Sequence, residues 1–159
     1  MPPEPARTVV SVAPDGAVLG SAKLAPNQGG PGDHVANASF MVAPAAAGRG
    51  VGRALAAHLL DAARADGYRA MQFNAVVATN TRAVGLWRSL GFEVIGRVPE
   101  GFRHPRPGVR RPAGHAPAPG LRVAQDLRKF RPQPLSPRSP HGMLVEPAPA
   151  APAAPAPGT

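Results

Sequence analysis

The chain has 159 residues, no cysteine and a formal net charge of +9. The absence of cysteine excludes disulfide frameworks, thiol nucleophiles and cysteine-based metal sites. The five histidines are too scattered to suggest a metal site. No run of about 18 apolar residues is present, so no membrane-spanning helix is expected. The first residues lack the apolar stretch of a secretory signal, and the expected location is the cytoplasm.

Composition divides the chain after His104. Residues 1–104 hold 24 of the 32 Leu, Ile, Val and Phe residues, whereas residues 105–159 hold 14 of the 22 prolines. The first part can bury a modest core, but the second cannot offset the entropy lost on ordering. We therefore expect a folded core in residues 1–104 and a disordered Pro/Arg/Ala-rich tail in residues 105–159. A weak helical pattern over Leu121–Phe130 is too short to hold alone.

The first half of the core has the pattern of three antiparallel strands. Two β-branched or apolar runs flank the turn Pro14-Asp15-Gly16, where Gly16 supplies a positive φ, and so predict a hairpin. A Gly-rich loop at residues 27–33 follows it. A third strand then enters the core and stops before Pro44. The expected strands are Arg7–Val12, Ala17–Leu24 and His34–Val42.

The second half alternates helices and strands. Apolar residues recur at helical spacing from Val51 to Asp66, and Gly67 ends this helix. A strand dense in apolar residues, Ala70–Val77, is typical of a central strand. Asn80 or Thr81 can cap a short helix, Arg82–Leu90, and Phe92–Val98 is the last expected strand. The predicted fold class is α/β, in the order β-β-β-α-β-α-β.

A glycine-rich turn lies between the third strand and the first helix. The sequence Ala47–Leu55 reads AGRGVGRAL. Free N–H groups at a helix N-terminus and its dipole favour an anion there, and glycines let a phosphate approach the backbone. The Walker pattern is absent because Gly52-Arg53-Ala54 lacks the Lys and the hydroxyl. The dinucleotide pattern G-x-G-x-x-G also fails, and the parallel context it needs is missing.

Two motifs together resemble the GNAT superfamily of acetyl-CoA-dependent N-acetyltransferases. The glycine turn resembles the pyrophosphate loop R/Q-x-x-G-x-G/A of that family. The segment Asn80–Phe92 (NTRAVGLWRSLGF) resembles its N-x-x-A-x-x-L-Y-x-x-x-G-F motif. The resemblance covers about residues 17–104. It implies a mixed, mostly antiparallel central sheet flanked by helices, whose central strands splay apart to hold the pantetheine arm of acetyl-CoA.

The resemblance also implies roles for individual residues. The backbone of Met41 and Val42 would bind the pantetheine amides, and an N–H nearby would polarise the thioester carbonyl. Asn80 would contact the arm of the cofactor and cap the second helix, with capping alone as the alternative. The pyrophosphate would lie against the loop, whose expected binding residues are Gly48, Arg49, Gly50, Val51, Gly52 and Arg53. For the two arginines the alternative is solvated charge.

Several positions depart from the family pattern. Ala47 stands where the family usually has Arg or Gln, so one contact to the pyrophosphate is lost. Trp87 stands at the position of the usual Tyr acid, and an indole does not ionise usefully. Trp87 is therefore expected to pack against the cofactor arm or within the core, and the catalytic residues stay unassigned. Glu93, Glu100 or water are candidate bases for the amine.

The activity implied by the resemblance is transfer of the acetyl group from acetyl-CoA to a primary amine of unknown identity. The expected partners are acetyl-CoA and this amine, without a metal or a membrane, and a homodimer stays open. The alternatives are a non-catalytic acetyl-CoA-binding remnant and a weak nucleic-acid binder acting through the basic tail. Compared with the family, the core is expected to be truncated at both ends. After residue 104 the composition changes abruptly to Arg, Pro, Ala and Gly. This change indicates either a change of reading frame or a natural extension.

Overall fold

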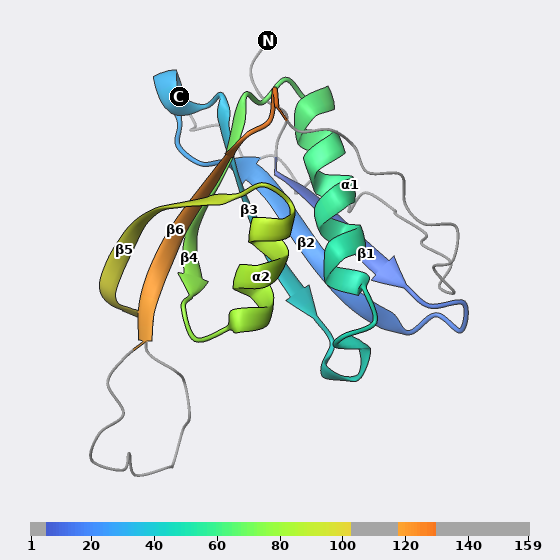
Figure 1. Ribbon diagram of the computed structural model, residues 1–159. Coiled ribbons are helices and arrows are strands. Elements are labelled where there is room, and N and C mark those ends of the chain that lie inside the picture. The colour runs from blue at the N-terminus through green and yellow to red at the C-terminus, as the bar shows by residue number, and fades with distance from the viewer. Residues whose placement is uncertain (1–5, 103–117, 130–159) are drawn as a thin grey trace, which may run out of the picture.

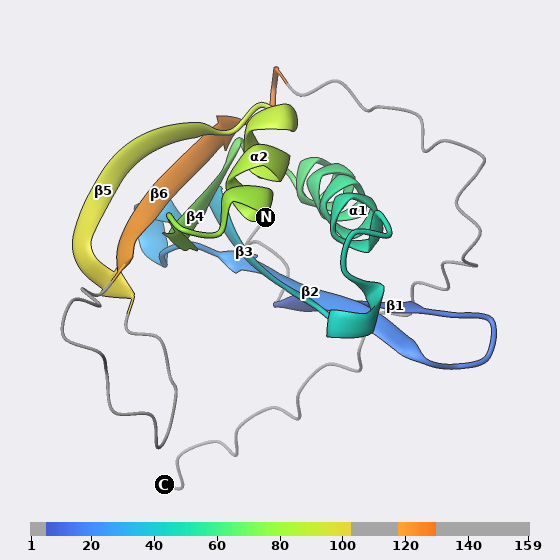
Figure 2. The same cartoon turned by 60° about the horizontal axis from the view of Figure 1, so that its bottom comes forward.

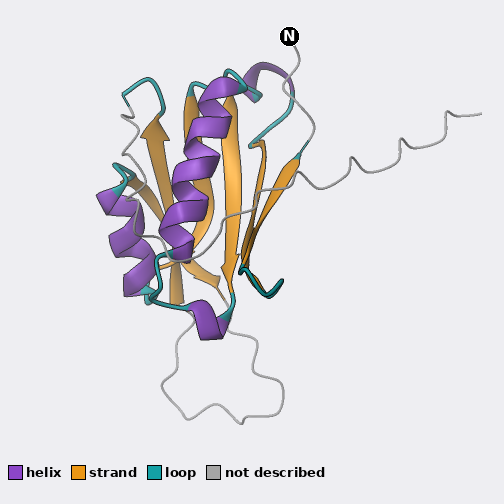
Figure 3. Ribbon diagram, turned by 90° about the vertical axis from the view of Figure 1, so that its right-hand side faces the viewer, coloured by secondary structure: helices purple, strands orange, loops and turns teal. Residues whose placement is uncertain are grey.

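The computed structural model describes residues 6–102 and 118–129. These residues form one sheet with two helices on one of its faces (Figures 1 and 3). The elements in chain order are β1 (Arg7–Val12), β2 (Val18–Pro26), the 3₁₀ turn η1 (Gly30–Gly32), β3 (Val35–Val42), the 3₁₀ turn η2 (Pro44–Ala46), α1 (Val51–Ala65), β4 (Ala70–Val77), α2 (Thr81–Ser89), β5 (Glu93–Phe102) and β6 (Ala118–Asp126).

The sheet is mixed and mostly antiparallel, with strand order β1-β2-β3-β4-β6-β5. Among the strands of the described residues, only β3 and β4 run parallel, and α1 makes the crossover between them. The remaining neighbours, β1–β2, β2–β3, β4–β6 and β6–β5, are antiparallel. The predicted fold class is therefore confirmed, and so is the predicted order of the helices and strands from β1 to β5.

The core lies between the sheet and the two helices. On α1, Leu55, Leu59 and Leu60 are fully buried and belong to one cluster with Val9 of β1 and Leu24 of β2. Their spacing is the apolar stripe that predicted the helix. Figure 2 shows how the sheet curves, so that β5 and β6 wrap towards α2 while β1, β2 and β3 lie under α1.

The strand β6 corrects the predicted domain boundary. Ala118–Asp126 is a strand between β4 and β5, so the prediction of a disordered tail is wrong for these residues. The weak helical pattern noted over Leu121–Phe130 forms no helix in residues 121–129. Leu121, Val123 and Leu127 are buried, in the alternation of a strand. The period of two was present in LRVAQDL, but the surrounding prolines outweighed it. Residues 105–117 and 130–159, where the rest of the tail prediction falls, lie outside the described residues.

Candidate functional site

The parallel strands β3 and β4 separate soon after they begin. Their paired positions are Val35 with Ala70, Ala36 with Met71, and Asn37 with Gln72. Beyond these pairs β3 continues to Val42 and β4 to Val77, and in the described structure the two strands are no longer partners. A gap therefore opens towards the end of β3 that leads into α1. Peptide groups along this gap are left for another partner to satisfy.

The register of β2 against β3 decides which peptide groups face the gap. The Asn27 N–H donates to the Val35 carbonyl at 2.7 Å, and the Ala43 N–H donates to the Leu19 carbonyl at 2.9 Å. The register between these ends is continuous. Hydrogen-bonded and non-hydrogen-bonded pairs alternate in an antiparallel ladder, so odd-numbered residues of β3 bond to β2. The peptide groups of Ala38, Phe40 and Val42 consequently point into the gap.

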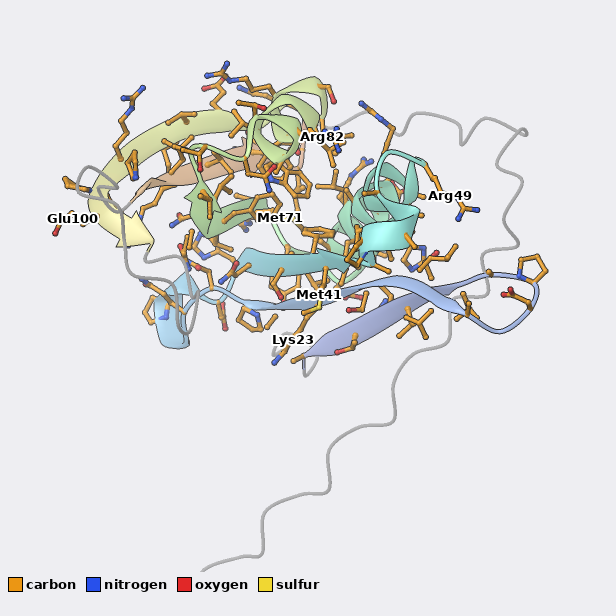
Figure 4. The ribbon with its side chains drawn as sticks, turned by 90° about the horizontal axis from the view of Figure 1, so that it is seen from below. Lys23, Met41, Arg49, Met71, Arg82 and Glu100 are labelled. Atoms are coloured by element: carbon orange, nitrogen blue, oxygen red, sulfur yellow. The ribbon has the colours of Figure 1, made fainter. Side chains whose placement is uncertain are left out.

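This assignment separates the two residues predicted to bind the pantetheine arm. Val42 faces the gap with its backbone, as the prediction requires. The peptide groups of Met41 are directed to β2, opposite Ser21, so the register disagrees with the prediction for Met41. Its side chain is 73% exposed on the sheet face away from the helices (Figure 4). The peptide groups of Phe40, which the sequence did not single out, face the gap instead, and only the register could have identified them.

Aromatic rings pack against one another on the face of β3 and β4 that is turned towards the helices. Phe40 of β3 and Phe73 of β4 have ring centroids 5.7 Å apart. The Trp87 ring of α2 packs on both, at 4.8 Å from Phe40 and 4.6 Å from Phe73. Trp87 is 7% exposed and so belongs to the core. It also underlies the gap, so both roles considered for it remain compatible with its position.

The loop after β3 brings the start of α1 to the open end of the gap. Gly48 and Gly50 have φ values of 78° and 85°, in the region that favours glycine. Gly50 is the N-cap residue, and no side chain caps the helix. In the described part of the chain, no acceptor is positioned for the N–H groups of Gly50, Val51 and Gly52. No acidic residue occurs in the first turn, so this end suits an anion.

The two arginines of the loop motif have different surroundings. The side chain of Arg53 donates to the Ser89 hydroxyl at 2.7 Å, and that hydroxyl donates to the Leu86 carbonyl at 2.7 Å. Arg53 therefore ties α1 to α2 in this conformation. Arg49 lies on the exposed loop beside the helix start (Figure 4). The predicted phosphate contacts of both side chains remain predictions.

Asn80 caps the second helix. Its side-chain oxygen accepts a hydrogen bond from the Ala83 N–H at 3.1 Å, at the N-cap position of α2. The capping part of the prediction is thus confirmed, and contact with the cofactor arm stays a prediction. The cap matters for the site because α2 carries Trp87 to the aromatic cluster.

A second concavity lies at the opposite end of the parallel pair. Its volume is about 630 Å³, and it is lined by residues including Ala70, Glu93 and Asp126. Ala70 belongs to the closed, paired part of β3 and β4, so this groove is separate from the gap. Hydrogen bonds from Arg128 lower the pKa of the Asp126 carboxyl to about 2.

The two candidate bases, Glu93 and Glu100, lie in different parts of the structure. Glu93 lines this second groove at the start of β5. Glu100 lies at the outer end of β5 with φ 51°, far from Met41 in Figure 4. The structure does not bring either of them together with the loop. Within residues 6–102 and 118–129, no group of His, Asp and Glu forms a metal site, and no helix is long and apolar enough to cross a bilayer.

Comparison with known proteins connects this geometry to a family. The model of the acetyltransferase (GNAT) family matches residues 2–92. The N-acetyltransferase aca1 of Schizosaccharomyces pombe is 33% identical over 101 residues, which are 64% of this chain and 48% of that protein. The chain thus spans about half the length of this curated relative.

Two solved structures share the fold. A GCN5-related N-acetyltransferase from Kribbella flavida is 54% identical, with a TM-score of 0.69 over 79% of this chain and 71% of that one. The yncA protein of Salmonella typhimurium, solved with its cofactor acetyl-CoA, is 27% identical, with a TM-score of 0.62 over 78% of this chain and 66% of that one. Since the family model covers more than half of the residues, the chain belongs to the GNAT family of acetyltransferases.

Proposed function

We propose that this protein is an N-acetyltransferase that moves the acetyl group of acetyl-CoA to a primary amine. The observation that carries the proposal is that two features lie next to each other. The gap between β3 and β4 opens beside the start of α1, where the helix N–H groups have no acceptor in the described part of the chain. The Salmonella relative, solved with acetyl-CoA, supports the choice of ligand.

The residues of this chain would hold two parts of acetyl-CoA, the pyrophosphate and the pantetheine arm. The N–H groups of Gly50, Val51 and Gly52 would hold the pyrophosphate, because a helix N-terminus favours an anion. The peptide groups of Phe40 and Val42 would hold the amides of the pantetheine arm as a further strand would. The exposed backbone of β3 would then be satisfied by the ligand.

The proposed reaction needs no catalytic side chain that forms a covalent bond. Acetyl-CoA supplies an activated thioester, and the amine would attack it directly. An acetylated cysteine intermediate is excluded because the chain has no cysteine. A nitrogen–carbon bond forms at the acetyl carbon, the carbon–sulfur bond breaks to release the thiolate, and the nitrogen gives up one proton to water. A peptide N–H facing the gap would stabilise the negative charge that develops on the carbonyl oxygen.

The leaving group explains why Trp87 is tolerated at the position of the usual acid. A thiol has a pKa of about 8.5 by analogy with cysteine, so a thiolate leaves near neutral pH without being protonated first. The indole of Trp87 cannot act as an acid. It would instead exclude water from the arm and keep Phe40 and Phe73 in place.

The test combines binding with turnover. Acetyl-CoA should raise the melting temperature of the full chain, and a panel of primary amines should include one that releases free thiol faster than the enzyme-free control. A rise in melting temperature without thiol release would support the non-catalytic acetyl-CoA binder instead. An unchanged melting temperature at millimolar acetyl-CoA would contradict the proposal.

A further inference from the structure

Gly20 lies where three elements of the proposed site meet. It belongs to β2, is buried, and pairs with Val42 at the end of β3. A Cβ atom added at this position would lie 2.7 Å from the Met41 carbonyl oxygen. It would also lie 3.2 Å from Leu55 Cδ1 and 3.3 Å from Val51 Cγ1 of α1. The missing side chain therefore leaves room for both β3 and the first two turns of α1.

The closest of these contacts is with the Met41 carbonyl oxygen, a backbone atom, so a change of side-chain rotamer cannot remove it. Cβ atoms in proteins essentially never approach another heavy atom within 3.0 Å, so the strand that carries the Met41 carbonyl would have to move. On its other side β2 is held by β1 over the whole length of β1. The edge of β3 beyond Asn37 faces the gap and has no strand partner there. A side chain at position 20 would accordingly push β3 into the gap.

The other two contacts concern the seat of α1. Val51 is the first residue of the helix, and Leu55 lies one turn later. Both side chains are buried, with exposures of 5% and 1%. Crowding them would lift the first turn away from the sheet. The N–H groups of Gly50, Val51 and Gly52 would then leave their position beside the gap.

We propose that Gly20 is a positioning residue that sets both the width of the gap and the seat of the α1 N-terminus. The inference rests on the proposed function, because it assigns the two affected regions to the arm and the pyrophosphate of acetyl-CoA. Gly20 touches neither of them and acts through β3 and α1. A side chain at position 20 narrows the gap and lifts the helix, so it weakens binding of the cofactor.

The experiment compares Gly20→Ala with Gly96→Ala. Gly96 is a strand residue of β5 with nothing within 4 Å of an added Cβ, so it is a matched control. We expect Gly20→Ala to raise the KM for acetyl-CoA about tenfold, which corresponds to about 1.4 kcal/mol. The kcat at saturating acetyl-CoA should fall less. Gly96→Ala should match the wild type in both constants.

Two ligands separate the two effects. Coenzyme A carries the nucleotide, the pyrophosphate and the pantetheine arm, whereas 3′-phosphoadenosine 5′-diphosphate has the same nucleotide and pyrophosphate but lacks the arm. Calorimetric titration of Gly20→Ala should show weaker binding of both. Adding Val51→Ala removes the contact with Val51 Cγ1, while Leu55 Cδ1 and the Met41 carbonyl stay crowded. The double variant should therefore regain part of its affinity for the diphosphate and remain weak for coenzyme A.

The outcomes are distinct. A wild-type chain that binds neither ligand would refute the proposed function itself. A wild type that binds, with a Gly20→Ala variant of lower melting temperature but unchanged KM and affinities, would reduce Gly20 to a packing role and overturn the inference. Should Gly20→Ala fail to fold, the double variant decides, because wild-type affinity for coenzyme A in that variant would equally overturn it.

Discussion

Gly50 and Gly52 are two residues apart in the loop motif, but the structure gives them different roles. Gly50 has a φ of 85°, and an added Cβ would meet nothing within 4 Å, so its requirement is conformational. Gly52 has no positive φ, and an added Cβ would contact Leu86 and Val42 at 3.6 Å. At position 52 a small side chain would therefore point into the protein rather than towards a bound phosphate.

This difference predicts that the alanine variants of Gly50 and Gly52 differ in stability and in affinity for coenzyme A. Gly50→Ala should lower the free energy of unfolding by about 1–2 kcal/mol, the cost of a left-handed conformation for a residue with a side chain. It should also weaken coenzyme A binding. Gly52→Ala should keep stability and affinity within about threefold of the wild type, since the contacts it adds are at ordinary distances. Urea denaturation and calorimetry measure both.

The loss of coenzyme A affinity in Arg49→Ala can be compared with the loss in a glycine variant of the loop. If the loop backbone carries the affinity, the loss in Arg49→Ala should be smaller than that in Gly50→Val, whose branched side chain is both strained and bulky. A larger loss for Arg49→Ala would show that the side chain, and not the N–H groups, holds the pyrophosphate.

At the scale of the elements, the cap of α2 links local stability to the site. Asn80→Ala removes the acceptor for the Ala83 N–H and should cost about 1 kcal/mol of unfolding free energy. Asn80→Asp keeps an acceptor at the same position and is the control. Because α2 carries Trp87, tryptophan fluorescence during denaturation reports the change. Equal midpoints for the Ala and Asp variants would mean that the cap contributes nothing.

The end of β6 carries an exposed ion pair with a pH signature. Arg128 holds the pKa of Asp126 at about 2, below its ordinary value of 3.8. A folded pKa below the unfolded one adds stability above about pH 4, and this contribution is lost as the pH falls through 2. Arg128→Ala should raise the pKa of Asp126 towards 3.8, as measured by NMR of the carboxyl carbon. The stability difference should be small because the pair is solvent-exposed. An unchanged pKa in the variant would contradict this account.

Elements with a strong period in the sequence were predictable, whereas their partners in the sheet were not. The stripe of α1 and the glycine that ends it are local signals, as are Asn80 and the loop motif. The strand β6 was missed because prolines on both sides outweighed the alternation of Leu121, Val123 and Leu127. The roles of Phe40, Met41 and Gly20 depend on register, which arises only when β2 and β3 pair.

At the scale of the whole molecule, β6 joins a distant segment to the core. It lies between β4 and β5. The strand and Leu127, which follows it, bury three large aliphatic side chains, each worth about 1.5–3 kcal/mol on burial. Their sum approaches the total stability of a small domain, about 5–15 kcal/mol. A chain that stops after His104 should therefore not fold cooperatively.

A chain that stops after Lys129 is the matched control, since it keeps β6. It should unfold cooperatively, with a denaturation midpoint close to that of the full chain. Circular dichroism during thermal denaturation compares the three lengths. A stable, cooperative fold for residues 1–104 would show that β6 is dispensable and would restore the boundary expected from composition.

The most direct test of the proposed site is the response of individual backbone amides to acetyl-CoA. In a titration followed by ¹H–¹⁵N NMR, the account predicts the largest shifts at Phe40 and Val42 along the gap and at Gly50, Val51 and Gly52 at the start of α1. The amides of Glu93 and Ala124 at the second groove should stay unchanged. Shifts concentrated at that groove, or no shifts at saturating acetyl-CoA, would contradict the assignment of the gap as the acetyl-CoA site.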